Sequence, residues 1–241
     1  MDRVAFVIPC FNASKNIEKL LLSLKSQDDD HWYAWFIDDM SEDDTAEQIV
    51  HVSKELGVFD HVHVVKNEEK KYALKNVVET VREFAKLNDI IAVLDGDDQL
   101  CYEGTVSLLR DIYQKNEFSD QMTAWTAHKW DVNDLNISGV FPLKVDPYQY
   151  LWKTSHLKTF SAALLLGISD ENFKDHNGEW FKRGYDQALY LPLLHQAKER
   201  AYIPVVCYLY NIESVSMTRR DWSEMEQLAS IRFIRARGFV R

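Results

Sequence analysis

The amino-acid sequence predicts an α/β domain with a doubly wound, mostly parallel sheet of the Rossmann type. The first observation is that its first half alternates short apolar runs with segments of helical periodicity. The second is that the apolar runs are continuous, as expected of strands buried on both faces. The third is that the connections are short and polar, which favours successive strand–helix units with right-handed crossovers.

Four such units follow one another. The predicted strands cover residues 4–8, 32–37, 61–65 and 90–94. We expect Ser14 to cap the first helix, and Ser41 or Asp43 to cap the second. The third helix is expected over residues 72–87. In a sheet of this kind ligands bind at the carboxyl ends of the strands, so the residues that follow each strand are the candidates for a site.

The second half is less regular. Here the predicted elements are a helix over 102–116, a strand over 122–127, a polar and aromatic stretch over 130–150, a helix over 186–197, a strand over 203–210 and an amphipathic helix over 223–237. No linker divides the chain. We therefore expect one domain over residues 1–220, with a C-terminal helix over 221–241 packed on it.

Composition narrows the classes of function. The chain has 241 residues and a formal net charge of -10, which disfavours broad contact with nucleic-acid phosphates. Its three cysteines lack the spacing of a zinc site or a disulfide framework. No apolar run approaches the roughly 20 residues that span a bilayer. We expect a cytoplasmic protein with at most peripheral membrane contact, and we make no prediction of its oligomeric state.

The turn Asp95-Gly96-Asp97-Asp98 follows the fourth strand and is the strongest candidate site. Three carboxylates in four residues repel one another unless a cation or buried donors compensate. Hard oxygen ligands suit Mg²⁺ or Mn²⁺, which also bridge to substrate phosphates. The alternative is a solvated turn that caps a helix. The pair Asp38-Asp39, after the second strand, either forms a turn that caps a helix or hydrogen-bonds through a carboxylate to a base imide or a ribose hydroxyl.

Taken together, four segments resemble family 2 glycosyltransferases of the GT-A fold. In chain order they are Ile8-Pro-Cys-Phe-Asn12, Ile37-Asp-Asp-Met-Ser-Glu-Asp-Asp-Thr45, Ala73-Leu-Lys-Asn76 and Leu94-Asp-Gly-Asp-Asp98. The resemblance implies that residues 1–100 bind a nucleotide-sugar and that residues 101–220 face the acceptor. It departs from the family at Met40, where glycine is usual, and at Lys75, where arginine is commoner.

The resemblance also implies roles for single residues. It assigns Pro9, Asn12 and Asp39 to the nucleoside pocket, with Lys75 nearby. It assigns Asp97 and Asp98 to the metal ion and the diphosphate. Asp95 is expected to touch the ribose or the sugar of the donor.

The second half resembles the family less closely. His156-Leu-Lys-Thr-Phe160 is similar to a His-Leu-Arg-Thr-Phe segment of some members, and Gly184-Tyr-Asp186 lies where the family places its catalytic carboxylate. We therefore predict Asp186 as the base, with Asp175 and Glu179 as alternatives. His156 either binds a phosphate of the donor, faces the acceptor or satisfies a local hydrogen bond.

Further segments complete the prediction. Residues 210–216 resemble the segment that closes over the donor, and Arg219 and Arg220 either reach the diphosphate or form a solvated pair. Several aromatic residues either stack on a sugar or belong to the core: Trp125, Trp130, Tyr148, Tyr150, Trp152 and Trp180.

The predicted function is an inverting transfer of a sugar from a nucleotide-sugar, with a UDP-sugar as the expected donor and a carbohydrate or other hydroxyl as the acceptor, in glycan or polysaccharide biosynthesis. Mn²⁺ or Mg²⁺ is the expected cofactor. Two alternatives are a catalytically silent nucleotide-sugar-binding module and a nucleotidyltransferase-like enzyme. The absence of a GxxxxGK[ST] loop disfavours the second.

Overall fold

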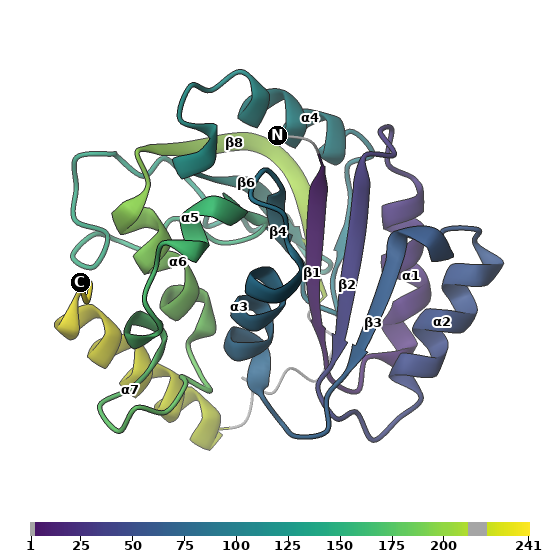
Figure 1. The fold of residues 1–241 in the computed structure, drawn as a ribbon, viewed down its shortest axis with the longest axis horizontal. Coiled ribbons are helices and arrows are strands. Elements are labelled where there is room, and N and C mark those ends of the chain that lie inside the picture. The colour runs from purple at the N-terminus through teal and green to yellow at the C-terminus, as the bar shows by residue number, and fades with distance from the viewer. Residues whose placement is uncertain (1–2, 212–220) are drawn as a thin grey trace.

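The computed structural model describes residues 3–211 and 221–241, and it has a mixed sheet covered by helices on both faces (Figure 1). The strands run in the order β3-β2-β1-β4-β7-β6-β8-β5. Their bounds are β1 Val4–Cys10, β2 Trp32–Asp38, β3 Val62–Lys66, β4 Ile90–Val93, β5 Gln99–Leu100, β6 Met122–Trp130, β7 Lys158–Ser161 and β8 Glu199–Tyr210. The predicted α/β fold class is confirmed.

The helices divide between the two faces of the sheet. Their bounds are α1 Ser14–Lys25, α2 Thr45–Glu55, α3 Tyr72–Phe84, α4 Thr105–Gln114, α5 Ala162–Leu166, α6 Tyr185–Gln196 and α7 Asp221–Arg237. Alternate residues of β1 enter different cores. Ala5 and Val7 pack with residues of α3, α5 and α6, whereas Phe6 and Ile8 pack with residues of α1, α2 and α4. This burial on both faces explains why the predicted strands are continuously apolar.

The two parts of the sheet differ in strand direction. Strands β3, β2, β1 and β4 pair in parallel, as the regular strand–helix pattern predicts. Strand β7 then pairs antiparallel with both β4 and β6, and β6 pairs in parallel with β8. The sequence prediction missed β7, α5 and the two-residue strand β5, because each is too short to show a period.

The predicted helix caps need correction. Ser14 is the first residue of α1 rather than its cap, and neither α1 nor α2 has a side-chain cap. Instead, the Asp43 carboxylate accepts hydrogen bonds from the backbone N–H groups of both Ser14 and Thr45. The Ser41 hydroxyl accepts one from the backbone of Asn12. These bonds tie the loops after β1 and β2 together at the edge of the sheet.

Helix α7 packs on α6 mainly through its C-terminal half. The Arg235 guanidinium donates to the side chain of Gln187 and to the backbone carbonyls of Tyr148 and Tyr150. Ile234 is fully buried, whereas Met225 and Leu228 are 75% and 54% exposed, so the amphipathic pattern predicted along the whole helix is wrong for its first half. None of the described helices is long and apolar enough to cross a membrane.

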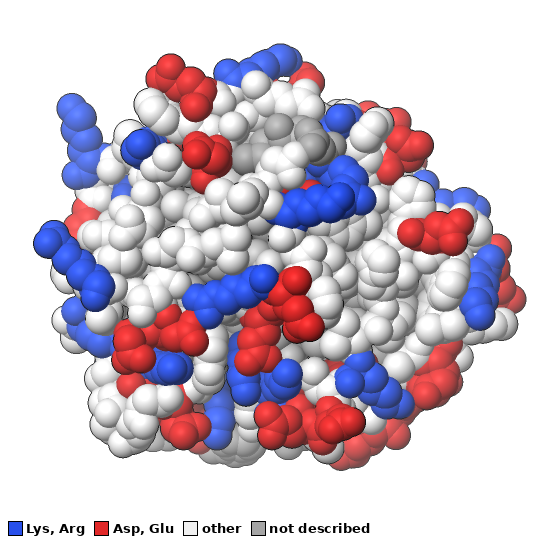
Figure 2. All heavy atoms as spheres, viewed as in Figure 1, with Lys and Arg blue, Asp and Glu red and all other residues white. Residues whose placement is uncertain are grey.

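Acidic and basic side chains are interspersed on the molecular face that Figure 2 shows. The ion pairs on and around α3 include Lys71 with Glu79, Lys75 with Glu69 and Glu79, and Arg82 with Asp170. Because exposed pairs of this kind contribute little to stability, they serve chiefly to keep this surface solvated.

Candidate active site

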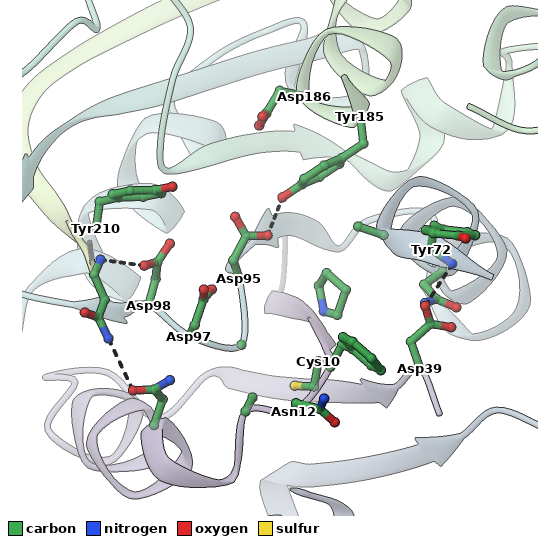
Figure 3. Close-up of a pocket in the computed structure, with 18 of the residues that line it drawn as sticks. Cys10, Asn12, Asp39, Tyr72, Asp95, Asp97, Asp98, Tyr185, Asp186 and Tyr210 are labelled. Carbon is green, nitrogen blue, oxygen red and sulfur yellow. Dashed lines mark hydrogen bonds between the residues drawn. The ribbon is translucent and has the colours of Figure 1, made fainter. Parts of the chain in front are cut away.

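A cavity of about 1060 Å³ lies at the carboxyl ends of the parallel strands. Seven of the predicted site residues line it: Pro9, Asn12, Asp39, Asp95, Asp97, Asp98 and Asp186. Figure 3 shows the acidic turn at its centre, Asp39 and Tyr72 on one side, and Asp186 above Asp95. The first half of the chain supplies the floor of the cavity. Asp186, Tyr185 and Tyr210 enter from the second half.

The acidic turn is pressed onto the end of β1. The Gly96 N–H donates to the Pro9 carbonyl at 3.1 Å, and the Asp98 N–H donates to the Asp95 carbonyl at 3.0 Å. A Cβ at position 96 would lie 2.6 Å from the Cys10 Sγ and 3.0 Å from the Pro9 oxygen. Only glycine allows this close approach, so Gly96 fixes where the neighbouring carboxylates point.

Side chains of the second half hold the carboxylates of the turn. The Tyr185 hydroxyl donates to Asp95, and the Tyr208 hydroxyl donates to Asp98. The Asn211 N–H donates to the second Asp98 oxygen at 2.7 Å. Tyr208 lies near the end of β8 and Asn211 directly follows that strand. The end of β8 therefore orients Asp98, a candidate metal ligand.

The electrostatics of the turn suit a bound cation. Burial, together with the carboxylates of Asp186 and Asp97, raises the pKa of Asp95 to about 7. Burial and the same crowding by Asp97 and Asp95 raise the pKa of Asp98. A divalent cation relieves this repulsion, and its preferred ligands are hard oxygens of this kind. The acidic turn therefore fits Mg²⁺ or Mn²⁺.

A second acidic group lies elsewhere among the described residues. Asp29, Asp30 and His31 bring three ligand atoms within 4.8 Å of one another. However, Asp29 pairs with Arg110 and with His31, and the other two side chains are exposed. These residues precede β2 and do not line the cavity, so we assign them no role in the site.

Asp39 organises the loop between β3 and α3. One of its oxygens accepts from the Asn67 side chain and from the Lys71 N–H, and the other accepts from the Tyr72 N–H at 2.9 Å. The Lys70 ammonium donates to the Asp39 carbonyl and lies over the Phe11 ring. The sequence analysis missed Lys70, Phe11 and Tyr72, although all three line the cavity.

Backbone strain gathers in the same loops. Three non-glycine residues adopt a left-handed backbone: Asn12 at φ 52°, Met40 at φ 61° and Tyr72 at φ 64°. Each such position costs roughly 1–3 kcal/mol and persists only where the surroundings impose it. At position 40, family 2 glycosyltransferases usually have glycine. Here Met40 adopts the left-handed backbone that glycine adopts without strain.

The structure places Lys75 differently from the prediction. Its ammonium lies 3.8 Å from Glu69 and 3.7 Å from Glu79, and it is not among the residues that line the cavity. Residues 71, 75 and 79 follow one another at the helical spacing of four and share the outer face of α3. Ala73 and Asn76 face the cavity instead.

Asp186 lies in the first turn of α6, after Gly184, whose left-handed φ of 70° starts the helix. Its carboxylate forms an ion pair with Lys158. Burial would raise the pKa of Asp186, but the neighbouring Lys158 ammonium holds it below its usual range. The group is therefore ionised at neutral pH and competent to accept a proton.

The alternative bases lie outside this cavity. Asp175 accepts from the backbone N–H groups of Asn177 and Glu179 in the turn before α6, and neither Asp175 nor Glu179 lines the cavity. The geometry therefore favours Asp186.

His156 does not line the cavity either. Its ring stacks on Tyr208 at 4.5 Å and on Tyr210 at 5.5 Å between centroids. Burial and Lys158 lower its pKa, so the ring is neutral. His156 therefore belongs to an aromatic layer behind the site and not to the lining of the cavity.

Of the aromatic residues considered from the sequence, Trp125 and Tyr148 are buried in the core. The predicted closing segment lies, apart from Tyr210 and Asn211, outside the described residues, as do Arg219 and Arg220.

Comparison with known protein families gives a match to the model described as glycosyl transferase family 2, over residues 5–168. The chain belongs to this family. The matched region contains every predicted donor-side residue and ends before Asp186. A comparison with curated protein sequences gives no match.

Solved structures share the GT-A fold at low sequence identity. S. aureus TarS 1–349 in complex with UDP-GlcNAc is 19% identical, with a TM-score of 0.64, over 96% of this chain and 65% of that chain. The mannosyltransferase PcManGT from Pyrobaculum calidifontis, in complex with GDP-Man and Mn²⁺, is 16% identical, with a TM-score of 0.59, over 95% of this chain and 63% of that chain. The family 2 protein described here thus spans less than two thirds of each of these relatives.

Proposed function

We propose that this family 2 protein is an inverting glycosyltransferase that moves a sugar from a nucleoside-diphosphate sugar to a hydroxyl acceptor. The observation that carries the proposal is that one cavity brings together an ionised carboxylate, Asp186, and the acidic turn of Asp95, Asp97 and Asp98. The same cavity extends to Phe11 and Asp39, which offer an aromatic face and an acceptor oxygen to a nucleoside.

The proposed step is a single in-line displacement. The acceptor oxygen forms a bond to the anomeric carbon of the donor, and the bond from that carbon to the diphosphate oxygen breaks. The nucleoside diphosphate leaves with the electron pair, and the acceptor hydroxyl gives its proton to the free oxygen of Asp186. One positioned base of this kind contributes about 10²–10⁴-fold to a rate.

Asp97 and Asp98 are the residues proposed to hold Mn²⁺ or Mg²⁺. Two carboxylates leave coordination positions for diphosphate oxygens and water, which is how these ions are usually bound. The ion would neutralise charge on the departing diphosphate. Asp95, which is held by Tyr185, is proposed to face the ribose or the sugar.

The donor is proposed to be a UDP-sugar, bound by Pro9, Asn12 and Asp39 in residues 1–100. The TarS structure in complex with UDP-GlcNAc supports this choice, and the PcManGT structure with GDP-Man and Mn²⁺ gives the second donor to test. The acceptor is proposed to be a carbohydrate that enters from the side of residues 101–220, within a role in glycan assembly.

The test uses water as the acceptor. The protein is incubated with UDP-GlcNAc or GDP-mannose and Mn²⁺, and the released nucleoside diphosphate is measured. We expect slow hydrolysis that stops with a chelator. Asp97→Ala should abolish Mn²⁺-dependent donor binding, whereas Asp186→Asn should retain binding and lose about 100-fold in hydrolysis.

Two results would contradict the proposal. If neither donor raised the melting temperature or were turned over, the chain would be a silent module or an enzyme of another class. If Asp186→Asn hydrolysed the donor at the wild-type rate, Asp186 would not be the base. Lys75→Met, on the outer face of α3, is the matched control and should leave both donor binding and hydrolysis unchanged.

A further inference from the structure

Behind Asp186 lies a lysine that the proposed chemistry does not use. Lys158 is the first residue of β7, and in the sheet it pairs with Val93 of β4 on one side and Trp125 of β6 on the other. Its side chain is 2% exposed, and it does not line the cavity. A buried, charged ammonium is costly unless it is paired, so its partner needs an explanation.

That partner is Asp186. The Lys158 ammonium donates to Oδ1 of Asp186, whose side chain is 34% exposed and lines the cavity. The carboxylate therefore stands between the lysine and the cavity. Figure 3 shows it reaching toward the space above Asp95. Since Oδ1 is occupied, Oδ2 is the oxygen that an acceptor hydroxyl can reach.

The other titratable groups near Lys158 are two neutral histidines and a carboxylate, so Lys158 supplies the positive charge beside Asp186. His156 and His128 are neutral, because burial and the nearby Lys158 lower the pKa of each, to about 4 for His128. Asp95 is the second carboxylate within its influence, and Lys158 opposes the rise of its pKa. One buried ammonium thus offsets the repulsion between the two carboxylates on this side of the cavity.

We propose that Lys158 is a positioning residue for the reaction: it fixes the rotamer and charge of Asp186 so that Oδ2 meets the acceptor. This inference rests on the proposed function. It names a residue of strand β7 that is 28 positions from the proposed base on helix α6. Lys158 touches neither donor nor acceptor, so its removal should change turnover without changing donor affinity.

The experiment measures Mn²⁺-dependent hydrolysis of UDP-GlcNAc and, separately, the Kd of UDP. Lys158→Met keeps the aliphatic stem and removes the charge. We expect hydrolysis to fall by about 10²-fold, the loss expected for a misplaced catalytic group, while the Kd for UDP changes by less than about threefold. Lys158→Arg, which restores a cation, should recover most of the activity. Lys115→Met, at an exposed lysine directly after α4, is the control.

A double-mutant cycle separates positioning from a general effect on the fold. If Lys158 acts through Asp186, then Lys158→Met should cause no further loss in the Asp186→Asn background. In Lys158→Gln, the acidic limb of the pH–rate profile should move to higher pH, because Asp186 loses its cation. If Lys158→Met fails to fold, Lys158→Gln and Lys158→Arg carry the same comparison.

Three outcomes would overturn the inference: wild-type hydrolysis in Lys158→Met, losses that multiply in the double variant, or an equal loss of UDP affinity. These outcomes are distinct from failure of the proposed function itself. If the proposed function fails, the wild-type protein hydrolyses no donor, or Asp186→Asn has no effect on hydrolysis. If the wild type and Lys158→Met were fully active and Asp186→Asn were inactive, the proposed role of Lys158 would be wrong and the proposed function would stand.

Discussion

The two halves of the chain build their sides of the cavity in different ways. In the first half, strands β1, β2 and β4 end at the cavity edge, and residues at or just after these ends enter the site directly, as Pro9, Asp39 and Asp95 do. In the second half, the contributing residues are brought in by contacts that span many positions. Tyr185 reaches Asp95, and Tyr208 reaches Asp98 across 110 positions. Strand geometry places the proposed donor side, whereas long-range packing places the proposed catalytic side.

The largest expected effect breaks the donor side at its tightest point. Gly96→Ala puts a methyl group 2.6 Å from the Cys10 sulfur, so the turn has to move away from β1. A shift of about 1 Å costs on the order of 100-fold in turnover. Hydrolysis of UDP-GlcNAc with Mn²⁺ measures the effect, and Gly167→Ala, at a φ of -81° outside the cavity, is the control for loss of a glycine. Wild-type activity in Gly96→Ala would show that the turn tolerates displacement.

The next effect breaks a tie between the halves. Tyr208→Phe removes the hydroxyl that donates to Asp98 and leaves the sheet packing in place. Groups that orient a metal ligand typically contribute 10–100-fold to metal affinity, and we expect a loss of about that size. Titration with Mn²⁺ in the presence of UDP measures it. Tyr113→Phe, whose hydroxyl meets Thr159 in the core, is the matched control. Equal Mn²⁺ affinities in wild type and Tyr208→Phe would show that the Tyr208 hydroxyl of β8 does not contribute to metal binding.

The third effect concerns the pH dependence of the free energy of unfolding. The second half of the chain buries His128, which is 1% exposed. Burial, with Lys158 nearby, lowers its pKa to about 4 in the folded protein, below the value near 6.5 expected in the unfolded chain. The unfolded state therefore binds a proton first. This histidine's stabilisation is present above pH 6.5 and is lost as the pH falls toward 4, by up to about 1.4 kcal/mol per pH unit.

Denaturant unfolding between pH 7.5 and 5 measures this loss. His128→Gln should flatten the pH dependence of the free energy of unfolding in that window, whereas His51→Gln, at an exposed site of α2, should not. The same slope in wild type and His128→Gln would contradict the assignment.

The smallest effect concerns a single strained residue of the donor side. Met40 has a φ of 61°, and its side chain is 45% exposed, so removing the side chain loses little packing. Met40→Gly should raise the free energy of unfolding by about 0.5–1 kcal/mol, since glycine adopts this backbone without strain. Met40→Ala keeps the Cβ and should give no such gain. A gain shared by both variants would point to the side chain rather than the backbone.

The same contrast explains how far the sequence could predict the molecule. The parallel strands and the acidic turn were predictable because local periodicity and the residues after each strand carry the information. Strand β7 was not, since four residues flanked by an irregular segment show no period. Its partners, β4 and β6, are fixed only by the packing of the whole sheet.

Site residues divide in the same way. Asp186 was found through a resemblance, but the ion pair with Lys158 that orients it depends on two distant elements meeting. Lys70 was missed because Lys70, Lys71 and Lys75 are alike in sequence, and only the helix start at Tyr72 decides which of them reaches the cavity. Tyr185 and Tyr208 were not predicted as site residues because an aromatic side chain beside a strand or helix is more often part of a core.

The reversed direction of β7 has a consequence for how this chain can vary. A parallel strand beside β4 would bring its last residue to the cavity edge, but β7 brings its first, Lys158. The chain therefore arrives at the site straight from residues 131–157, which contain no helix or strand. Insertions or deletions in this stretch alter the surface next to the cavity while leaving the hydrogen-bonded register of the eight strands unchanged. The shape of this surface can thus change with loop length alone, on a sheet that keeps the acidic turn and Lys158 in place.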